Sequence, residues 1–336
     1  MRLEEFDYYL PKELIAKYPV EPRDSCRLMV LDRKTEKIEH RIFRDLPDYL
    51  SEGDLIVFNN SKVIPARLIG VKEGGRAKIE VFLIRQIEDN IWYALIKNVR
   101  RLKKGQNIII SPEFVVEFLD REDEKAVVKL HSNNISQDLE RYGHIPLPPY
   151  IDREDEDRDK QLYQTVFAKE EGSVASPTAG LHFTENLIER LKEKGVNIAF
   201  ITLHVGLGTF KPIQTEDITE HKMHEEFYTI PDEVIEVIQK TKQSGKSVIA
   251  VGTTVVRTLE SFAKTGIKEG FTDIFIYPPY KFKIVDKLIT NFHLPKSTLI
   301  LLVSAFASRE FILKAYSEAV KERYRFFSYG DAMLIL

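Results

Sequence analysis

Apolar and polar residues alternate in short runs along the middle of the chain, a pattern that predicts β-strands. Six such runs lie between residues 63 and 132: ARLIGVK, AKIEVFLIR, IWYALIKN, NIIIS, FVVEFLD and AVVKLHS. Turn-forming pieces such as EGG, EDN and KKGQ separate them. Short runs at this spacing are typical of a small antiparallel barrel or sandwich.

The pattern changes to alternating strands and helices after IPLPPYIDREDEDRDK, a proline-rich and then charged linker. In TENLIERLKEKG, Leu187, Ile188 and Leu191 share one helical face, Thr184 is the expected N-cap and Gly195 the expected stop. Further helices are predicted in PDEVIEVIQKTKQSG, TTVVRTLESFAKTG and EFILKAYSEAVKERY, and strands in VNIAFITL, SVIAV, DIFIY and AMLIL. This alternation predicts an α/β domain.

The N-terminal stretch through GDLIVFNN also has the texture of turns followed by a buried strand. We therefore expect an α/β main domain built from both chain ends, residues 1–62 plus 151–336. It would be interrupted by an inserted small antiparallel β-barrel at residues 63–150. A cleft between the two parts is the default place for a site.

Composition narrows the class of protein. The 336 residues carry 49 Lys and Arg against 52 Asp and Glu, a net charge of −3, so a nucleic-acid partner would need a local basic patch. The one cysteine, Cys26, excludes an internal disulfide and fits a reducing compartment. The start is too acidic for a signal peptide, and no apolar run approaches the roughly 18 residues of a membrane span. We expect a cytoplasmic protein.

Two loops are candidates for ligand binding. The strand SVIAV runs into Thr253 and Thr254 and then a helix that carries Arg257, and free amides with a guanidinium suit a carboxylate or phosphate. The alternative is a tight connection with the arginine on a solvated face. In HVGLGTFKP, Gly206 and Gly208 allow the backbone to approach a ligand closely, although the loop is not a dinucleotide fingerprint and could be a flexible connector.

Several histidines are candidates for acid–base chemistry. In HKMHEEFY, His221 and His224 are three apart and could share a helical face, yet the string lacks a zinc pattern, so a polar or acid–base role is favoured. His182, in the turn SPTAGLHF, either packs at a helix entrance or faces a ligand. For His293 in TNFHLPKSTL, a half-buried packing role is the alternative.

A short basic run is the best candidate for binding a phosphate backbone. KNVRRLKKG, residues 97–105, places five cations in one strand-and-turn region of the inserted domain. A solvated face is the usual explanation of such a run. Arg23 and Arg27, in RDSCRL, lie near the entrance to the first strand.

Taken together, a collinear series of strings resembles one family. The series is LPKELIAKYPVEPRDSCRLMVLDR, GDLIVFNNSKVIPARLIG, HIPLPPYI, PTAGLHFT, TLHVGLGTF, HKMHEEFY, VIAVGTTVVRTLES, TNFHLPKSTLILLVSAFA and YRFFSYGDAMLI. It covers almost the whole chain and resembles the S-adenosylmethionine:tRNA ribosyltransferase-isomerases. Ser176 stands where alanine is expected and Pro279 where glycine is expected.

The resemblance implies a step of queuosine biosynthesis. The ribosyl part of S-adenosylmethionine would be transferred to 7-aminomethyl-7-deazaguanine at the wobble position of tRNA and isomerised, giving epoxyqueuosine, adenine and methionine. It also implies an α/β domain interrupted by a β-barrel, a monomer, no metal, and no cofactor beyond S-adenosylmethionine as the ribosyl donor.

This chemistry requires a base for a 5′ proton made acidic by the sulfonium, and an acid for the departing adenine, which favours His and Glu. On residue chemistry we assign the acid–base pool to His182, His204, His224, Glu225 and His293. The S-adenosylmethionine pocket is assigned to Thr178, Gly180, Gly206 and Gly208, with Thr253, Thr254 and Arg257 for its carboxylate. The tRNA-facing residues are assigned as Arg23, Arg27, Arg100, Arg101 and Lys103.

Two other functions are considered. One is a non-catalytic tRNA-binding protein that uses the basic run of the β-domain. The other is a metal-dependent nucleic-acid hydrolase that uses His221 and His224.

The basic run yields a first prediction. Replacing Arg100 and Arg101 together by alanine should weaken tRNA binding and flatten its salt dependence, because fewer counterions are released, while affinity for S-adenosylmethionine stays unchanged. Binding titrations at several salt concentrations measure the slope. An unaltered slope would reject the assignment of the run to tRNA.

Overall fold

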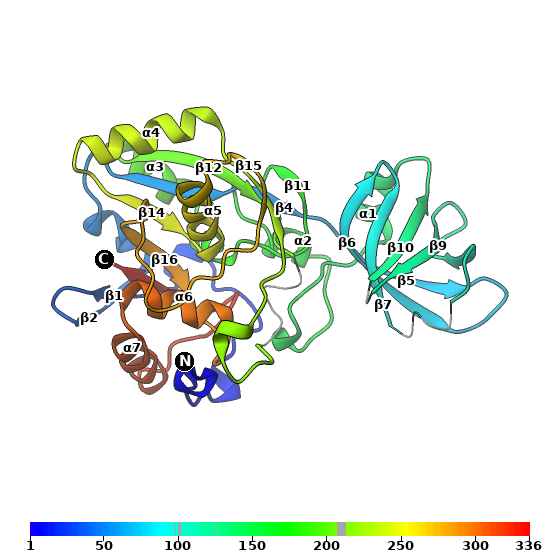
Figure 1. The fold of residues 1–336 in the computed structure, drawn as a ribbon, viewed down its shortest axis with the longest axis horizontal. Helices are drawn as coiled ribbons and strands as arrows, with labels where there is room; N and C mark the ends of the chain where they lie inside the picture. The colour runs from blue at the N-terminus through cyan, green and yellow to red at the C-terminus, as the bar shows by residue number, and fades with distance from the viewer. Residues whose placement is uncertain (98, 100–101, 124, 207–212) are drawn as a thin grey trace.

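The computed structural model describes residues 1–97, 99, 102–123, 125–206 and 213–336. Figure 1 shows two lobes, an α/β lobe that contains both chain termini and a β-barrel lobe beside it. The barrel is inserted into the chain of the α/β lobe, as the sequence predicts.

A large mixed sheet forms the centre of the α/β lobe. Its order over the described residues is β15-β13-β12-β3-β14-β16-β17-β1-β2. Neighbouring strands run parallel from β12 through β3 and β14 to β16, so their carboxyl ends meet at one edge. The strands are β1 Arg27–Asp32, β2 Lys37–Ile42, β3 Leu55–Asn59, β12 Asn197–Leu203, β13 Glu226–Thr229, β14 Val248–Val251, β15 Glu269–Thr272, β16 Lys287–Asn291 and β17 Ala332–Ile335.

The central strands are apolar throughout because both faces of the sheet are covered. In β3, Leu55 and Val57 point into one core, whereas Ile56 and Phe58 point into the other. The first core is completed by α4, α5, α6 and α7, and the second by α3 and the 3₁₀ segment η4. The sheet is therefore the middle layer of three.

Helices cover the sheet largely where the sequence predicts them. Thr184 caps α3 by accepting a hydrogen bond from the amide of Leu187 at 3.2 Å. The helices are α1 Ile135–Tyr142, α2 Asp159–Leu162, α3 Glu185–Glu193, α4 Asp232–Gln243, α5 Thr253–Thr265, α6 Thr298–Ala307 and α7 Arg309–Lys321. The 3₁₀ segments are η1 Leu3–Phe6, η2 Lys12–Leu14, η3 Arg23–Ser25, η4 Phe43–Tyr49, η6 Pro149–Ile151, η7 Thr178–His182 and η9 Ile218–Glu220.

The inserted lobe is a closed antiparallel barrel, which confirms the barrel prediction. Around the barrel, the described strands follow the order β10-β7-β6-β5-β8-β9. Alternate residues such as Val81, Leu83, Val116 and Val128 fill the interior. The strands are β5 Arg67–Lys72, β6 Lys78–Glu88, β7 Ile91–Ile96, β8 Gln106–Ile109, β9 Val115–Glu122 and β10 Lys125–His131.

A short parallel pair connects the two lobes. β4 (Ser61–Val63) leads toward the barrel and pairs with β11 (Glu170–Ser173), which lies on the returning chain. The amide of Ile64 donates to the carbonyl of Ser173 at 3.0 Å. The pair therefore fixes the entry and exit of the insertion side by side.

One local prediction is wrong, and one arrangement that was considered is absent. DIFIY, residues 273–277, is not a strand, because the chain leaves the sheet after β15 and packs Ile274 and Ile276 into the core. His221 and His224 do not share a helical face, since residues 221–225 are irregular and lead into β13. In DIFIY the apolar spacing reflects packing of Ile274 and Ile276 into the core rather than strand pairing.

Candidate active site

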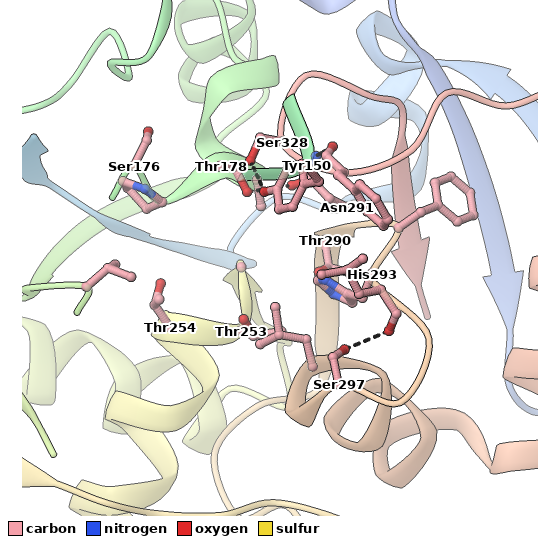
Figure 2. A pocket seen from close by; sticks show the side chains of 18 of the residues that line it. Tyr150, Ser176, Thr178, Thr253, Thr254, Thr290, Asn291, His293, Ser297 and Ser328 are labelled. Carbon is pink, nitrogen blue, oxygen red and sulfur yellow. Dashed lines mark hydrogen bonds between the residues drawn. The ribbon is translucent and has the colours of Figure 1, made fainter. Parts of the chain in front are cut away.

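A deep pocket lies at the carboxyl ends of the parallel strands, where α/β sheets place ligands. We call it the threonine pocket, because four threonines contribute to its wall (Figure 2). Its empty volume, including the opening, is about 910 Å³. The lining residues are Tyr150, Ser176, Pro177, Thr178, Ala179, Val205, Gly252, Thr253, Thr254, Thr290, Asn291, Phe292, His293, Leu294, Pro295, Ser297, Leu299, Phe327 and Ser328.

Two helices begin at this pocket. Gly252 connects β14 to α5 at φ +90°, a backbone conformation that favours glycine, and its amide donates to the carbonyl of Ile289 at 2.7 Å. α6 begins after Ser297, whose hydroxyl accepts from the amide of Ile300 at 3.3 Å. Figure 2 shows Thr253 and Ser297 at the two helix starts. The positive ends of both helix dipoles therefore point toward the cavity.

A second, larger opening lies between the lobes and is called the interdomain crevice. Its empty volume is about 1820 Å³, including open solvent. The lining residues are Ile84, Arg85, Gln86, Trp92, Tyr93, Leu95, Lys125, Glu171, Gly172, His204, Val205, Gly206, Met223, His224, Glu225, Glu226, Phe227 and Phe271. Strands of the barrel supply one wall, and β11, the segment after β12, β13 and β15 supply the other.

Aromatic faces and cations meet across the crevice. The guanidinium of Arg85, on the barrel, lies 5.0 Å from the ring centre of Phe271 on β15 and 5.3 Å from that of Tyr93. The ammonium of Lys125 lies 5.3 Å from the Tyr93 ring centre. Phe271 is 50% exposed, unusual for a phenylalanine away from an interface.

The segment after β12 separates the two openings. Extended backbone alternates its side chains, so Val205 is buried and lines both cavities while His204 faces the crevice. Side chains hold this segment in place: the amides of Leu203, Val205 and Gly206 donate to Asn59 Oδ1 at 3.1 Å, Ser173 Oγ at 2.9 Å and Glu226 Oε1 at 2.9 Å, respectively.

His204 has the environment of a general base. Its ring stacks on Phe227 with centroids 6.3 Å apart, and burial lowers the pKa of His204, so the imidazole is neutral near pH 7. Within the described residues, its buried Nδ1 has no hydrogen-bond partner. A side chain at Gly172 would come within 3.2 Å of the ring, so glycine there leaves room for His204.

Glu226 is held beneath the crevice by a buried ion pair. Its Oε2 accepts from Arg257 Nη1, and the two side chains are 3% and 4% exposed. Arg257 Nε donates to the carbonyl of Ile274 at 3.3 Å. Because Glu226 also accepts from the amide of Gly206, the pair anchors the segment that carries His204.

His182 lies behind the wall of the threonine pocket. Its Nδ1 is 3.2 Å from Cys26 Sγ, and its Nε2 is 3.0 Å from Asn291 Nδ2. Burial, aided by the positive charges of Arg23 and Arg325, lowers the pKa of His182 to about 3. Burial also raises the pKa of the Cys26 thiol, so this is a neutral pair and not a thiolate nucleophile.

His293 is part of the pocket wall and is also neutral. Its Nε2 lies 2.8 Å from Thr290 Oγ1, its amide donates to Tyr316 Oη at 3.0 Å, and its carbonyl accepts from the Tyr8 hydroxyl. Burial lowers the pKa of His293 to about 3. Near neutral pH, protonation of this buried histidine has a substantial free-energy cost.

Comparison with known proteins identifies the family. A sequence model described as "Queuosine biosynthesis protein" matches residues 3–335. The chain belongs to this family.

The sequence similarity to individual relatives extends over their full lengths. The S-adenosylmethionine:tRNA ribosyltransferase-isomerases of Sulfurihydrogenibium sp. (strain YO3AOP1) and Aquifex aeolicus (strain VF5) are 74% and 58% identical, with 100% of this chain and of each relative covered. A crystal structure of S-adenosylmethionine tRNA ribosyltransferase from Thermotoga maritima is similar with a TM-score of 0.58 and 45% identity, covering 99% of this chain and 100% of that one.

The queuosine-family chain gathers its predicted site residues around the two openings. Thr178, Thr253, Thr254 and His293 line the threonine pocket, and His204, Gly206, His224 and Glu225 line the crevice. Gly180 packs against Phe167, where a Cβ would come within 2.8 Å, and lines neither opening.

The predicted basic residues of this family member divide into two groups. Arg23 donates to the carbonyls of Gln161, Leu162 and Gln164, and Arg27 lies 3.7 Å over the ring centre of Tyr324, so both are engaged within the α/β lobe. Lys103 is exposed on the barrel. The remaining three predicted residues lie outside the described ranges: Gly208, Arg100 and Arg101.

Other features bear on chemical class. Within the described ranges, no group of three or more His, Cys, Asp or Glu side chains is arranged for a metal ion. Of the helices in the described part of this queuosine-family protein, none is long and apolar enough to cross a membrane.

The sequence alone did not single out four residues that line or support the two openings: Asn59, Asn291, Glu226 and Phe271. For Glu226 a signal existed, because strand alternation in EFYTI buries Glu226, Tyr228 and Ile230 and leaves Glu225 exposed. The asparagines gave no local signal, since Leu203, a partner of Asn59, and His182, a partner of Asn291, are distant in the chain.

Burial of His182 yields a prediction about acid stability. The folded pKa lies below the unfolded value of about 6.5, so the unfolded state binds the proton more readily and stability is lost as pH falls below about 6.5. From pH 7 to pH 5, protonation of this histidine in the unfolded state should lower the free energy of unfolding by about 2 kcal/mol. In urea titrations, His182→Gln should reduce the difference between the unfolding free energies at pH 7 and pH 5 by that amount. Equal pH dependence of variant and parent would contradict the assignment.

Proposed function

We propose that this chain transfers and isomerises the ribosyl part of S-adenosylmethionine onto 7-aminomethyl-7-deazaguanine at the tRNA wobble position. The products are epoxyqueuosine in tRNA, adenine and methionine. Membership in the queuosine family and full-length relatives that carry the transferase name support this reading. The two openings fit its two substrates.

The threonine pocket suits S-adenosylmethionine. Its walls combine apolar residues with hydroxyls, and the start of α5, with Thr253 and Thr254, offers donors for the methionine carboxylate. Arg257, paired with Glu226, supports the neighbouring segment rather than the pocket wall. The hypothesis for the carboxylate therefore rests on the helix start and the threonines.

The interdomain crevice suits an unpaired nucleobase of tRNA. Single-stranded RNA is bound by aromatic faces on which bases stack and by cations that meet its phosphates. Phe271 and Tyr93 supply aromatic rings, and Arg85 and Lys125 supply cations. Lys103, the described member of the predicted tRNA-facing residues in the basic run, is exposed on the same barrel and would add a further cation for the phosphates.

Proton transfer falls to the residues at the crevice. The sulfonium makes the 5′ protons of S-adenosylmethionine acidic, and neutral His204 is placed to accept one. His224 and Glu225 are exposed on the same wall and can exchange protons with solvent and with the departing adenine. His182 and His293, both buried and neutral, serve as parts of the wall.

One observation carries the proposal: a single extended segment presents Val205 to both openings and His204 to the crevice. A ribosyl donor in one opening and an acceptor base in the other would therefore meet beside His204. Both substrates are reached from one chain, which supports the proposal of a monomer, and a tRNA substrate supports the cytoplasm. Sedimentation at a single-chain mass tests the first point, and cell fractionation the second.

Adenine release tests the reaction itself. Purified protein mixed with the modified tRNA and S-adenosylmethionine should release adenine only when both substrates are present. Tight tRNA binding without turnover would instead favour the non-catalytic binder. Ribosyl transfer that survives chelation, with no metal found by elemental analysis, would remove the hydrolase that uses His221 and His224.

The role of His204 gives a sharper prediction. His204→Ala should lower kcat by about 100-fold or more, the usual loss for a general base, while both substrates still bind and the fold is kept. His131→Ala, at an exposed histidine of the barrel, is the matched control and should retain activity. Glu225→Ala tests the carboxylate in the same assay. Full activity in either site variant removes that residue from the acid–base pool.

A further inference from the structure

A buried asparagine at the end of β16 has only one possible orientation. Asn291 Nδ2 lies 3.1 Å from the carbonyl of Phe327, which can only accept, so the amide group must face it as donor. The same Nδ2 donates to His182 Nε2 at 3.0 Å, which places the histidine proton on Nδ1, toward Cys26. Asn291 is 3% exposed. Its Oδ1 is therefore fixed as an acceptor facing Thr178.

The orientation of Asn291 determines what Thr178 offers to the pocket. Thr178 Oγ1 lies 3.2 Å from Asn291 Oδ1, and because that oxygen can only accept, the threonine donates its single proton there. The lone pairs of Thr178 are left for the threonine pocket, which this half-buried residue lines. Thr178 is thus an acceptor toward a ligand.

A second buried asparagine gives Thr254 the opposite polarity. Asn59 Oδ1 accepts from the amides of Ser61 and Leu203, both at 3.1 Å, which fixes Nδ2 as the donor side. Nδ2 donates to the carbonyl of Leu203 at 2.9 Å and to Thr254 Oγ1 at 3.4 Å. Thr254 accepts from the protein and lines the threonine pocket, so its hydroxyl proton can be donated to a ligand there.

We propose that Asn291 and Asn59 are positioning residues that fix the polarity of the threonine pocket, with Thr178 accepting from an N–H or O–H group of S-adenosylmethionine and Thr254 donating to one of its acceptors. This inference rests on the proposed function and goes beyond it, because it assigns the direction of two substrate hydrogen bonds. A ligand with the wrong polarity at Thr178 would face lone pairs and lose affinity.

The hydrogen-bond directions around Asn291 are fixed near neutral pH. A protonated His182 would carry a proton on Nε2, which would oppose the Asn291 amide and force it to turn. Burial holds the pKa of His182 at about 3, so that proton is absent near neutral pH. The histidine thus serves as a fixed acceptor that, with the carbonyl of Phe327, keeps the asparagine in place.

Binding of S-adenosylmethionine in the absence of tRNA tests the proposal by calorimetry. Thr178→Val keeps the shape but removes the hydroxyl and should weaken binding about tenfold, while Thr178→Ser keeps the hydroxyl and should bind like the parent. Asn291→Leu should cause a similar loss, and the double variant Thr178→Val with Asn291→Leu should be little worse than either. The matching pair for the other threonine is Thr254→Val and Thr254→Ser.

Steady-state kinetics separate positioning from a general structural role. The valine variants should raise KM for S-adenosylmethionine and leave KM for tRNA unchanged, with circular dichroism confirming the fold. Thr178→Val binding as tightly as the parent would overturn the inference, as would equal losses for valine and serine. If the parent releases no adenine when both substrates are present, the proposed function fails instead, so the two failures are distinguishable.

Discussion

The site depends on how the backbone after β12 is held. Asn59, Ser173 and Glu226 each accept a hydrogen bond from this segment, and each comes from a different strand of the structure. Extended geometry then sends successive side chains to opposite sides. His204 consequently faces the crevice, while Val205 forms the boundary between crevice and pocket. One short segment thus lies against both the pocket of the α/β lobe and the crevice between the lobes, and we propose that the two openings form one site.

The three histidines differ in burial. Burial holds His182 and His293 neutral with pKa values of about 3, which suits them to fix hydrogen-bond directions. His204 is only half-buried, burial lowers its pKa, and its side chain lines the interdomain crevice, so we propose it as the proton acceptor. On this proposal, how far each ring is removed from water decides whether a histidine fixes hydrogen-bond directions or transfers a proton.

The sequence predicts the architecture well where periodicity is clean. Strand alternation marks the barrel, and an amphipathic stripe with Thr184 as cap marks α3. Periodicity does not reveal the helix α6, TLILLVSAFA, because a helix that is buried on all sides has no polar face to mark its period. The apolar residues of DIFIY pack into the core and do not form a strand of the sheet. The asparagines could not be found locally, since Asn291 lies 109 positions from His182 and Asn59 lies 144 from Leu203.

A structure of the ternary complex with S-adenosylmethionine and the modified tRNA tests the central claim most directly. The account predicts that the cofactor lies in the threonine pocket, that the aminomethyl base lies in the interdomain crevice, and that the 5′ carbon is within proton-transfer reach of His204. A ribose lodged far from His204, or a base bound elsewhere on the surface, would contradict it.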